Sequence, residues 1–319
     1  MKPVTKSAAS WLVGLLLVLM TLAAVAEEPV EEVAGTLGAV GSDTLAGLML
    51  RWGERLGERY PGVRLQLQAS GSASAPAALI AGTTRLGPMS RPMTREEREA
   101  FVVRYGYPPL ELEIGRDALV VVVHRHNPLE SLSQAELDAI FSDTRRCGAE
   151  SAIDRWSQLG VTLPGDRIVL HGRNVASGTH GLFRRVALCG GRFRLRLNEH
   201  PGSAAAVAAV AAEPSAIGYA GLNHLTASVK AVARRDAEGR LQRPGPETVR
   251  RGEYPLSRDL FLYINLPPGG RLPGPEQAFI ELVLSPEGQE IVEEAGFVAL
   301  SEAVRERQRA WLEDGEPPG

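Results

Sequence analysis

Apolar positions along the chain follow two spacings, one typical of strands and one typical of helices. A glycine-rich apolar segment at 34–41 precedes apolar residues three or four positions apart between 45 and 56, which predicts a strand and then a helix. Alternating apolar positions at 63–67 predict a second strand. Residues 118–123 are apolar without interruption, as expected for a strand buried on both faces.

The order of strand, small polar loop and helix recurs through the rest of the chain. Further strands are predicted at 168–170, 217–219 and 260–264. Further helices are predicted at 75–81, 95–105, 133–141, from 181, at 203–212, 274–286 and 287–295. Thr94 and Glu97 form a capping box for the helix that follows them. Residues 230–256 are charged and rich in turn-forming residues, so we expect them to be irregular.

Strands that alternate with helices indicate an α/β fold with mainly parallel sheets flanked by helices. The length of 319 residues suggests two such lobes. Hydrophobic residues make up 44% and charged residues 23% of the chain, which excludes wholesale disorder. The formal net charge of -3 lacks the basic excess of a nucleic-acid-binding protein, so we expect no nucleic-acid partner.

The N-terminal segment is typical of an export signal. Lys2 and Lys6 precede an apolar run from Trp11 to Leu22, and Ala24-Val25-Ala26 is a small-residue cleavage motif. We therefore expect residues 1–26 to be removed after Ala26. No cysteine lies near this cut, so a soluble periplasmic protein is expected, and not a lipoprotein. A retained membrane anchor is the alternative, but the run is too short to span a bilayer.

The chain has two cysteines, Cys147 and Cys189. The oxidising compartment that an exported protein enters favours a disulfide between them, and two free thiols are the alternative. Two cysteines without a nearby pair of histidines make a poor zinc site. We expect neither a metal nor a cofactor.

Four loops rich in glycine, serine and threonine follow predicted strands. They are Gly41-Ser42-Asp43-Thr44, Ser70-Gly71-Ser72, Ser90-Arg91 and Arg173 to Thr179. At least three run into a predicted helix, whose first turn exposes unpaired N–H groups and a partial positive charge. Ligands bind at the carboxyl ends of strands in α/β sheets, and small residues let an anion approach the backbone. One such loop is ordinary helix capping, but four together predict an anion site.

Two of these loops carry an arginine, Arg91 and Arg173. A guanidinium can bind a tetrahedral oxyanion in fork geometry, although a lone arginine is more often a solvated surface charge. Asp43 would repel a fully deprotonated anion. Its carboxylate is useful only if the ligand carries a proton that it can accept, as phosphate does and sulfate does not.

The chain resembles the periplasmic phosphate-binding proteins of the phosphate ABC importer, which are type II periplasmic binding proteins. The resemblance rests on motifs that span nearly all of the chain after the leader: the Gly-Ser-Asp-Thr and Ser-Gly-Ser loops, Gly87 to Met93, Arg173 to Thr179, Ile217-Gly218-Tyr219 and Tyr254 to Arg258. The Arg-x-x-x-Ser-Gly-Thr loop is the most specific of them.

The resemblance implies two lobes joined by hinge strands, with phosphate held between them. Together with the loop chemistry it gives an expected ligand set of Ser42, Asp43, Thr44, Ser70, Gly71, Ser72, Ser90, Arg91, Arg173, Ser177, Gly178 and Thr179. Many members carry an aspartate in the third loop, where it accepts the proton of phosphate. This chain has Ser90-Arg91 there, which leaves the acceptor role to Asp43.

We expect the first lobe to comprise 34–118 and 258–312, the second lobe 119–257, and a flexible tail 313–319. The two cysteines lie in the second lobe. Phosphate would dock on the first lobe, the second would close over it, and an ABC permease would recognise the closed form. The protein is expected to act as a monomer.

Receptors for sulfate, molybdate or phosphonate are alternatives with the same architecture, and Asp43 argues against sulfate. A secreted phosphatase is the alternative from another class, because His171 and His180 flank the Arg173 loop and could act as nucleophile or acid. No carboxylate cluster for a catalytic metal accompanies them, and no nucleophile-elbow motif is present. We therefore expect a binding protein and not an enzyme. A scavenging or adhesion role without a transporter remains open.

Overall fold

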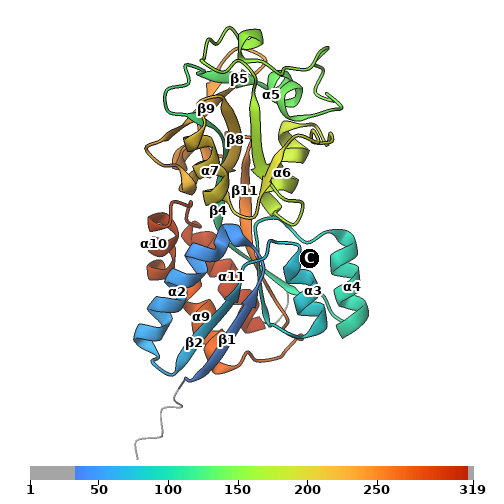
Figure 1. Cartoon of the computed structure of the whole chain (residues 1–319). Coiled ribbons are helices and arrows are strands. Elements are labelled where there is room, and N and C mark those ends of the chain that lie inside the picture. The colour runs from blue at the N-terminus through green and yellow to red at the C-terminus, as the bar shows by residue number, and fades with distance from the viewer. Residues whose placement is uncertain (1–32, 315–319) are drawn as a thin grey trace, which may run out of the picture. The chain divides into compact units, whose positions relative to one another are not determined.

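The computed structural model describes residues 33–314, which form an α/β structure (Figure 1). The predicted leader at 1–26 and residues 315–319 of the predicted tail lie outside the described residues. Helix and strand alternate along the chain as the hydrophobic pattern predicts. No helix within 33–314 has the length and apolar character needed to cross a membrane.

The first sheet contains strands from both ends of the described chain. β1 (Gly35–Val40) pairs in parallel with β2 (Val63–Gln68) and β3 (Leu86–Met89). β11 (Ser257–Ile264) pairs antiparallel with β3 on one side and with the first part of β4 (Leu110–His124) on the other. The helices that accompany this sheet are α2 (Ala46–Arg59), α3 (Ser74–Ala81), α4 (Arg95–Tyr105), α9 (Gly274–Val283), α10 (Pro286–Glu294) and α11 (Glu302–Asp314).

The second sheet is built around the last part of β4. β8 (Ala216–Gly221) pairs antiparallel with β4 and in parallel with β6 (Val169–Arg173), which pairs in parallel with β7 (Asn198–His200). β9 (Val229–Arg235) pairs with β4, β5 (Ser131–Ser133) and β10 (Leu241–Gln242). The helices of this part are α5 (Gln134–Phe141), α6 (Gly178–Ala187), α7 (Ser203–Ala212) and α8 (Pro246–Arg250). The prediction that 230–256 is irregular is therefore wrong, because this segment contains most of β9 together with β10 and α8.

β4 and β11 connect the two sheets, and Figure 1 shows both strands passing from one group of helices to the other. The partner of β4 changes from β11, up to Ala118, to β8, from Leu119. The outer strands pair in parallel as predicted, whereas the strands that cross between the sheets pair antiparallel. The two-lobe α/β fold that the sequence predicts is confirmed.

Each lobe has its own apolar core. In the first lobe, Trp52 of α2 is fully buried and packs edge-on against Phe279 of α9. In the second lobe, Phe183 of α6 stacks on Tyr219 of β8 with ring centroids 4.0 Å apart. α2 and α6 are thereby held at fixed positions on their sheets, and these two helices begin at the loops of the candidate site.

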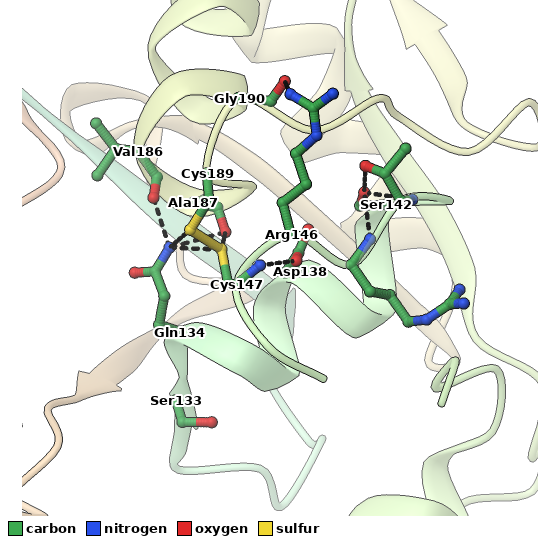
Figure 2. The surroundings of a disulfide bond; sticks show 12 residues. Ser133, Gln134, Asp138, Ser142, Arg146, Cys147, Val186, Ala187, Cys189 and Gly190 are labelled. Carbon is green, nitrogen blue, oxygen red and sulfur yellow. Dashed lines mark hydrogen bonds between the residues drawn. A yellow bond between two sulfur atoms is a disulfide. The ribbon is translucent and has the colours of Figure 1, made fainter. Parts of the chain in front are cut away.

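The predicted disulfide is present: Cys147 and Cys189 are bonded, with Cα atoms 5.5 Å apart. Figure 2 shows how the bond ties the loop after α5 to the end of α6, beside the side chain of Gln134. The Gln134 amide donates to the carbonyl oxygens of Val186 and Ala187, at 2.5 and 3.0 Å. The disulfide and these hydrogen bonds therefore fix the carboxyl end of α6, and the candidate site lies at its amino end.

Candidate anion site

The amino ends of α2 and α6 meet at the interface between the lobes. Ser42 caps the short helical turn Asp43–Leu45 that leads into α2, and its hydroxyl accepts a hydrogen bond from Thr44 N. Ser177 caps α6, and its hydroxyl accepts from Thr179 N. The hydroxyl oxygens of Thr44 and Thr179 are 3.3 Å apart. Two helix ends with partial positive charge therefore point to the same place from opposite lobes.

Arg173 lies at the centre of this interface and is fully buried. Its guanidinium pairs with Asp43 across the lobes, with Nη2 2.6 Å from Oδ2. Nη1 donates to the hydroxyl of Ser203 at the start of α7, and Nη2 also donates to the Pro201 carbonyl. The other carboxylate oxygen, Asp43 Oδ1, is buried without a hydrogen-bond partner. The guanidinium of Arg173 is thus held in one orientation, beside a carboxylate oxygen of Asp43 that can accept a proton.

Three serine hydroxyls of the first lobe form a contiguous group. Ser90 Oγ lies 3.1 Å from the hydroxyl oxygens of both Ser42 and Ser72, and all three side chains are fully buried. Gly178 of the second lobe packs against them so closely that a Cβ there would lie 2.5 Å from Ser90 Oγ. The serines and the start of α6 are therefore in close contact across the two lobes.

Glycine is required at a second point where the lobes touch. Gly71 has φ of +112°, a region that favours glycine, and a Cβ there would lie 2.8 Å from the carbonyl oxygen of Ala176. The same carbonyl accepts a hydrogen bond from Ala73 N at 3.3 Å. These backbone contacts bring the Ser-Gly-Ser and Arg173–Thr179 loops together.

Arg258 on β11 also enters this cluster, and it is absent from the ligand set expected from the sequence. Its Nη2 donates to Thr179 at 2.9 Å and to Thr44 at 3.4 Å, so it reaches both lobes. The guanidinium pairs with the buried Asp117 of β4, with Nη2 2.6 Å from Oδ2. Arg258 Nη1 and Asp117 Oδ1 have no hydrogen-bond partner. Burial lowers the pKa of Arg258, and Asp117 opposes that effect.

A sequence signal for Arg258 exists in the motif Tyr254 to Arg258, which leads into the apolar strand at 260–264. An arginine at the start of a buried strand requires an acidic partner, and Asp117 lies just before the apolar run at 118–123. The strand pairing that places these two residues opposite each other is known only from the structure. Ser203, at the start of α7, enters the cluster only because the side chain of Arg173 reaches it across 30 positions of sequence.

Two expected ligands are not brought into the cluster. The guanidinium of Arg91 forms two hydrogen bonds of 2.7 Å with the carboxylate of Glu97 at the start of α4. Ser70 is exposed, and its hydroxyl accepts from Gln68. Glu97 therefore binds the guanidinium of Arg91, and Arg258 is the second arginine in the buried cluster. Every other expected residue lies in the cluster or in the loops that form it.

The histidines near the Arg173 loop have other neighbours. Burial, assisted by Arg184 and Arg173, lowers the pKa of His180 to about 4, and its ring packs on Phe193. His171 and His200 contact each other, with ring nitrogens 2.9 Å apart, and burial lowers the pKa of both. Within residues 33–314 no hydrogen bond joins a histidine ring to the cluster. Burial lowers the pKa of His224 as well, and the charges of Asp117, Arg173 and Asp43 also act on it.

The donors of the cluster suit a tetrahedral oxyanion. Hydroxyls, two guanidinium groups and helix amides all donate hydrogen bonds, and they are excluded from solvent. In the part of the chain that the structure describes, no group of three histidine, cysteine or acidic side chains is placed to hold a metal ion. The site can bind an anion, and its unpartnered carboxylate oxygens can accept a proton from that anion.

Sequence comparison finds relatives over most of the chain. Residues 26–287 match a family model described as a PBP superfamily domain. The phosphate-binding protein PstS of Pseudomonas aeruginosa strain PAO1 is 45% identical over 280 residues, which is 86% of each chain. The phosphate-binding protein PstS of Staphylococcus epidermidis is 24% identical over 291 residues, covering 89% of this chain and 85% of its own.

Solved structures share the fold over a similar extent. A substrate-binding protein from Clostridium perfringens, assigned to a phosphate ABC transporter and solved with bound phosphate, superposes with a TM-score of 0.71 at 23% identity, over 84% of this chain and all of its own. An ABC-type phosphate transport receptor from Vibrio cholerae gives a TM-score of 0.65 at 19% identity, over 83% of this chain and all of its own.

Proposed function

The chain belongs to the PBP superfamily, and on that premise we propose that it captures inorganic phosphate between its two lobes and delivers it to an ABC permease. The observation that carries the proposal is the meeting of Arg173, Arg258 and two helix amino ends in one buried cluster. Asp43 and Asp117 each balance one of these arginines, and the two helix amino ends add partial positive charge that a bound anion would balance. The name of the P. aeruginosa relative supports phosphate as that anion.

The proposed ligands are the members of the cluster that can donate to phosphate or accept its proton. They are Ser42, Asp43, Thr44, Gly71, Ser72, Ser90, Arg173, Ser177, Gly178, Thr179 and, in addition to those expected from the sequence, Arg258. Ser70 and Arg91 are left out because of their contacts with Gln68 and Glu97.

Asp43 supplies the selectivity of the proposed site. Its free oxygen, Oδ1, can accept the proton that phosphate keeps at neutral pH. Sulfate has no proton to give, so the same carboxylate would repel it. Asp117 Oδ1 is a second buried acceptor in the cluster, held by Arg258. Phosphate is thereby favoured over sulfate.

Hinge closure is the proposed binding motion. The contacts of Arg173 with Asp43, and of Thr44 with Thr179, join the proposed lobes and support a closed state. The lobes are proposed to be 34–118 with 258–312, and 119–257, because β4 changes partner at Ala118 and β11 returns the chain near Ser257. Rotation about these two strands would open the site to solvent.

The protein is further proposed to be a monomeric, non-enzymatic component of the periplasm, cleaved after Ala26. The relatives named as phosphate-binding proteins support a binding role without hydrolysis. The positively charged and then apolar leader supports export. A closed lobe pair presents one continuous surface that a permease could recognise.

Calorimetric titration of the full-length product, expressed with its own leader and recovered from the periplasm, tests this proposal. After removal of carried phosphate, we expect one phosphate per chain, weaker arsenate binding, and little sulfate or molybdate binding. Mass spectrometry should give Glu27 as the first residue. No heat with any oxyanion, or hydrolysis of a chromogenic phosphate ester, would overturn the proposal.

A further inference from the structure

A second group of arginines lines a cavity of the second lobe that has no residue in common with the interlobe cluster. The cavity has a volume of about 500 Å³, within the range of small-molecule sites. It is lined by Asp143, Asp154, Arg155, Arg167, Arg194, Leu195 and Arg196. We call it the arginine cavity.

The fold brings the four guanidinium groups together from three segments. Arg155 and Arg167 are partners in an isolated antiparallel bridge, so they lie side by side. Arg194 begins a turn closed by a hydrogen bond from Leu197 N to the Arg194 carbonyl, and Arg196 lies within that turn. Arg194 and Arg196 both bind the carboxylate of Asp154, next to Arg155 in the chain. The convergence is long-range and is not a run of adjacent basic residues.

Positive charge exceeds negative charge in the arginine cavity. Four arginines and two aspartates line it: Asp154 binds both Arg194 and Arg196, and Asp143 pairs at 3.6 Å with Arg192, which is outside the lining. Arg155 pairs with Asp166 at 3.4 Å, whereas within residues 33–314 no ion pair involves Arg167. Burial lowers the pKa of Arg196. The charges of Arg194 and Arg167 lower it further, whereas the charge of Asp154 raises it. An anion would relieve this repulsion.

Arg194 carries one unsatisfied buried donor in the wall of the cavity. Its side chain is only 9% exposed, yet its Nε is buried without a hydrogen-bond partner. A buried guanidinium donor without a partner is costly. Planar guanidinium groups bind phosphoryl oxygens through paired hydrogen bonds, more favourably than ammonium groups do.

We propose that the arginine cavity is a second anion site, which takes a soluble ligand with two or more linked phosphate groups, such as a short condensed phosphate. The volume and the spread of donors over three segments exceed what one inorganic phosphate would fill. The site is independent of the interlobe cluster, so it binds whether or not phosphate occupies that cluster.

The probe is sodium tripolyphosphate, titrated calorimetrically into the full chain at saturating inorganic phosphate and at low and high salt. We expect a second binding event that weakens with salt. The double variant Arg155→Ala/Arg167→Ala should weaken it about tenfold or more, because two charge-assisted contacts are lost. Both residues are exposed, and Arg167 has no ion pair within 33–314, so the fold should tolerate the change. The single variant Arg167→Gln repeats the test with a smaller perturbation.

Two control variants show whether tripolyphosphate binds at this cavity and nowhere else. Arg185→Ala removes an exposed arginine of α6 outside the cavity and should leave tripolyphosphate binding unchanged. Arg173→Ala should lower the affinity for inorganic phosphate and leave the affinity for tripolyphosphate unchanged. This distinguishes failure of this proposal from failure of the proposed function. Absence of tripolyphosphate binding at low salt, equal affinity in the double variant, or equal loss in Arg185→Ala would overturn the proposal.

Discussion

Arg258 and Asp117 face each other on β11 and β4, the two strands that connect the lobes, with Nη2 2.6 Å from Oδ2. The pair is almost wholly buried, with side-chain exposures of 5% and 1%. The same guanidinium nitrogen donates to Thr179 of the second lobe. An ion pair between the two connecting strands thus contributes directly to the proposed phosphate site.

Replacing Arg258 with glutamine should cost both stability and affinity. The change leaves the Asp117 carboxylate buried without its cation, which typically costs about 3–5 kcal/mol in the free energy of unfolding. Urea unfolding without phosphate measures that cost, and calorimetry measures the phosphate affinity. The double variant Asp117→Asn/Arg258→Gln should regain part of the stability but not the affinity. Full recovery of phosphate affinity in the double variant would contradict a direct role for Arg258.

Replacing Asp43 with asparagine should change selectivity, and it should also cost stability because the buried Arg173 loses its carboxylate partner. The amide no longer accepts the proton of phosphate, so phosphate affinity should fall about tenfold or more, as expected for loss of a hydrogen bond to a charged group. Sulfate affinity should stay the same or rise, because a repulsive charge is removed. Parallel titrations with both anions measure the ratio. Equal losses for both anions would refute the role of Asp43 as proton acceptor.

Replacing Gly178 with alanine should weaken binding by opposing closure. The added Cβ would lie 2.5 Å from Ser90 Oγ and 2.8 Å from Ser72 Oγ, contacts that exist only when the lobes meet. A ligand that binds the closed state then loses affinity as closure becomes less favourable. Gly181→Ala is the matched control, because a Cβ at that position of α6 meets nothing within 4 Å. Similar phosphate affinities in the two variants would contradict closure over Ser72 and Ser90.

The stability of the phosphate-free protein should fall as the pH is lowered from 6.5 towards 4. Burial lowers the pKa of His180 from 6.5 to about 4, so the unfolded chain binds its proton first within that window. The contribution of His180 is therefore complete above pH 6.5 and is lost as the pH falls. His171 and His200 act in the same direction, because their pKa values are also lowered.

Urea unfolding at several pH values measures this slope. His180→Phe should make the slope shallower, since that side chain no longer takes up a proton in the unfolded state. His126→Gln, at an exposed position, is the control and should leave the slope unchanged. An unchanged slope in His180→Phe would show that other groups govern the acid response.

Much of the local structure is determined by neighbouring residues and was therefore predictable from the sequence. The capping box of Thr94 and Glu97 is present at the start of α4, because both hydrogen bonds join residues three positions apart. The Ser42 and Ser177 caps are also local, so the loops could be recognised as helix starts. The disulfide could also be predicted, because an exported chain with only two cysteines enters an oxidising compartment.

The tertiary structure decided which arginine joins Arg173 in the buried cluster. The Ser90-Arg91 loop has the composition expected of an anion-binding loop, but the guanidinium of Arg91 pairs with Glu97, six residues away. Arg258 meets Asp117 across 141 positions of sequence because the register of β4 and β11 sets them opposite each other. A helix cap joins a side chain to backbone amides within one helical turn, so it can be predicted from the local sequence. The partner of a long charged side chain depends on strand register and on which carboxylate lies within reach, and both are fixed only when the chain folds.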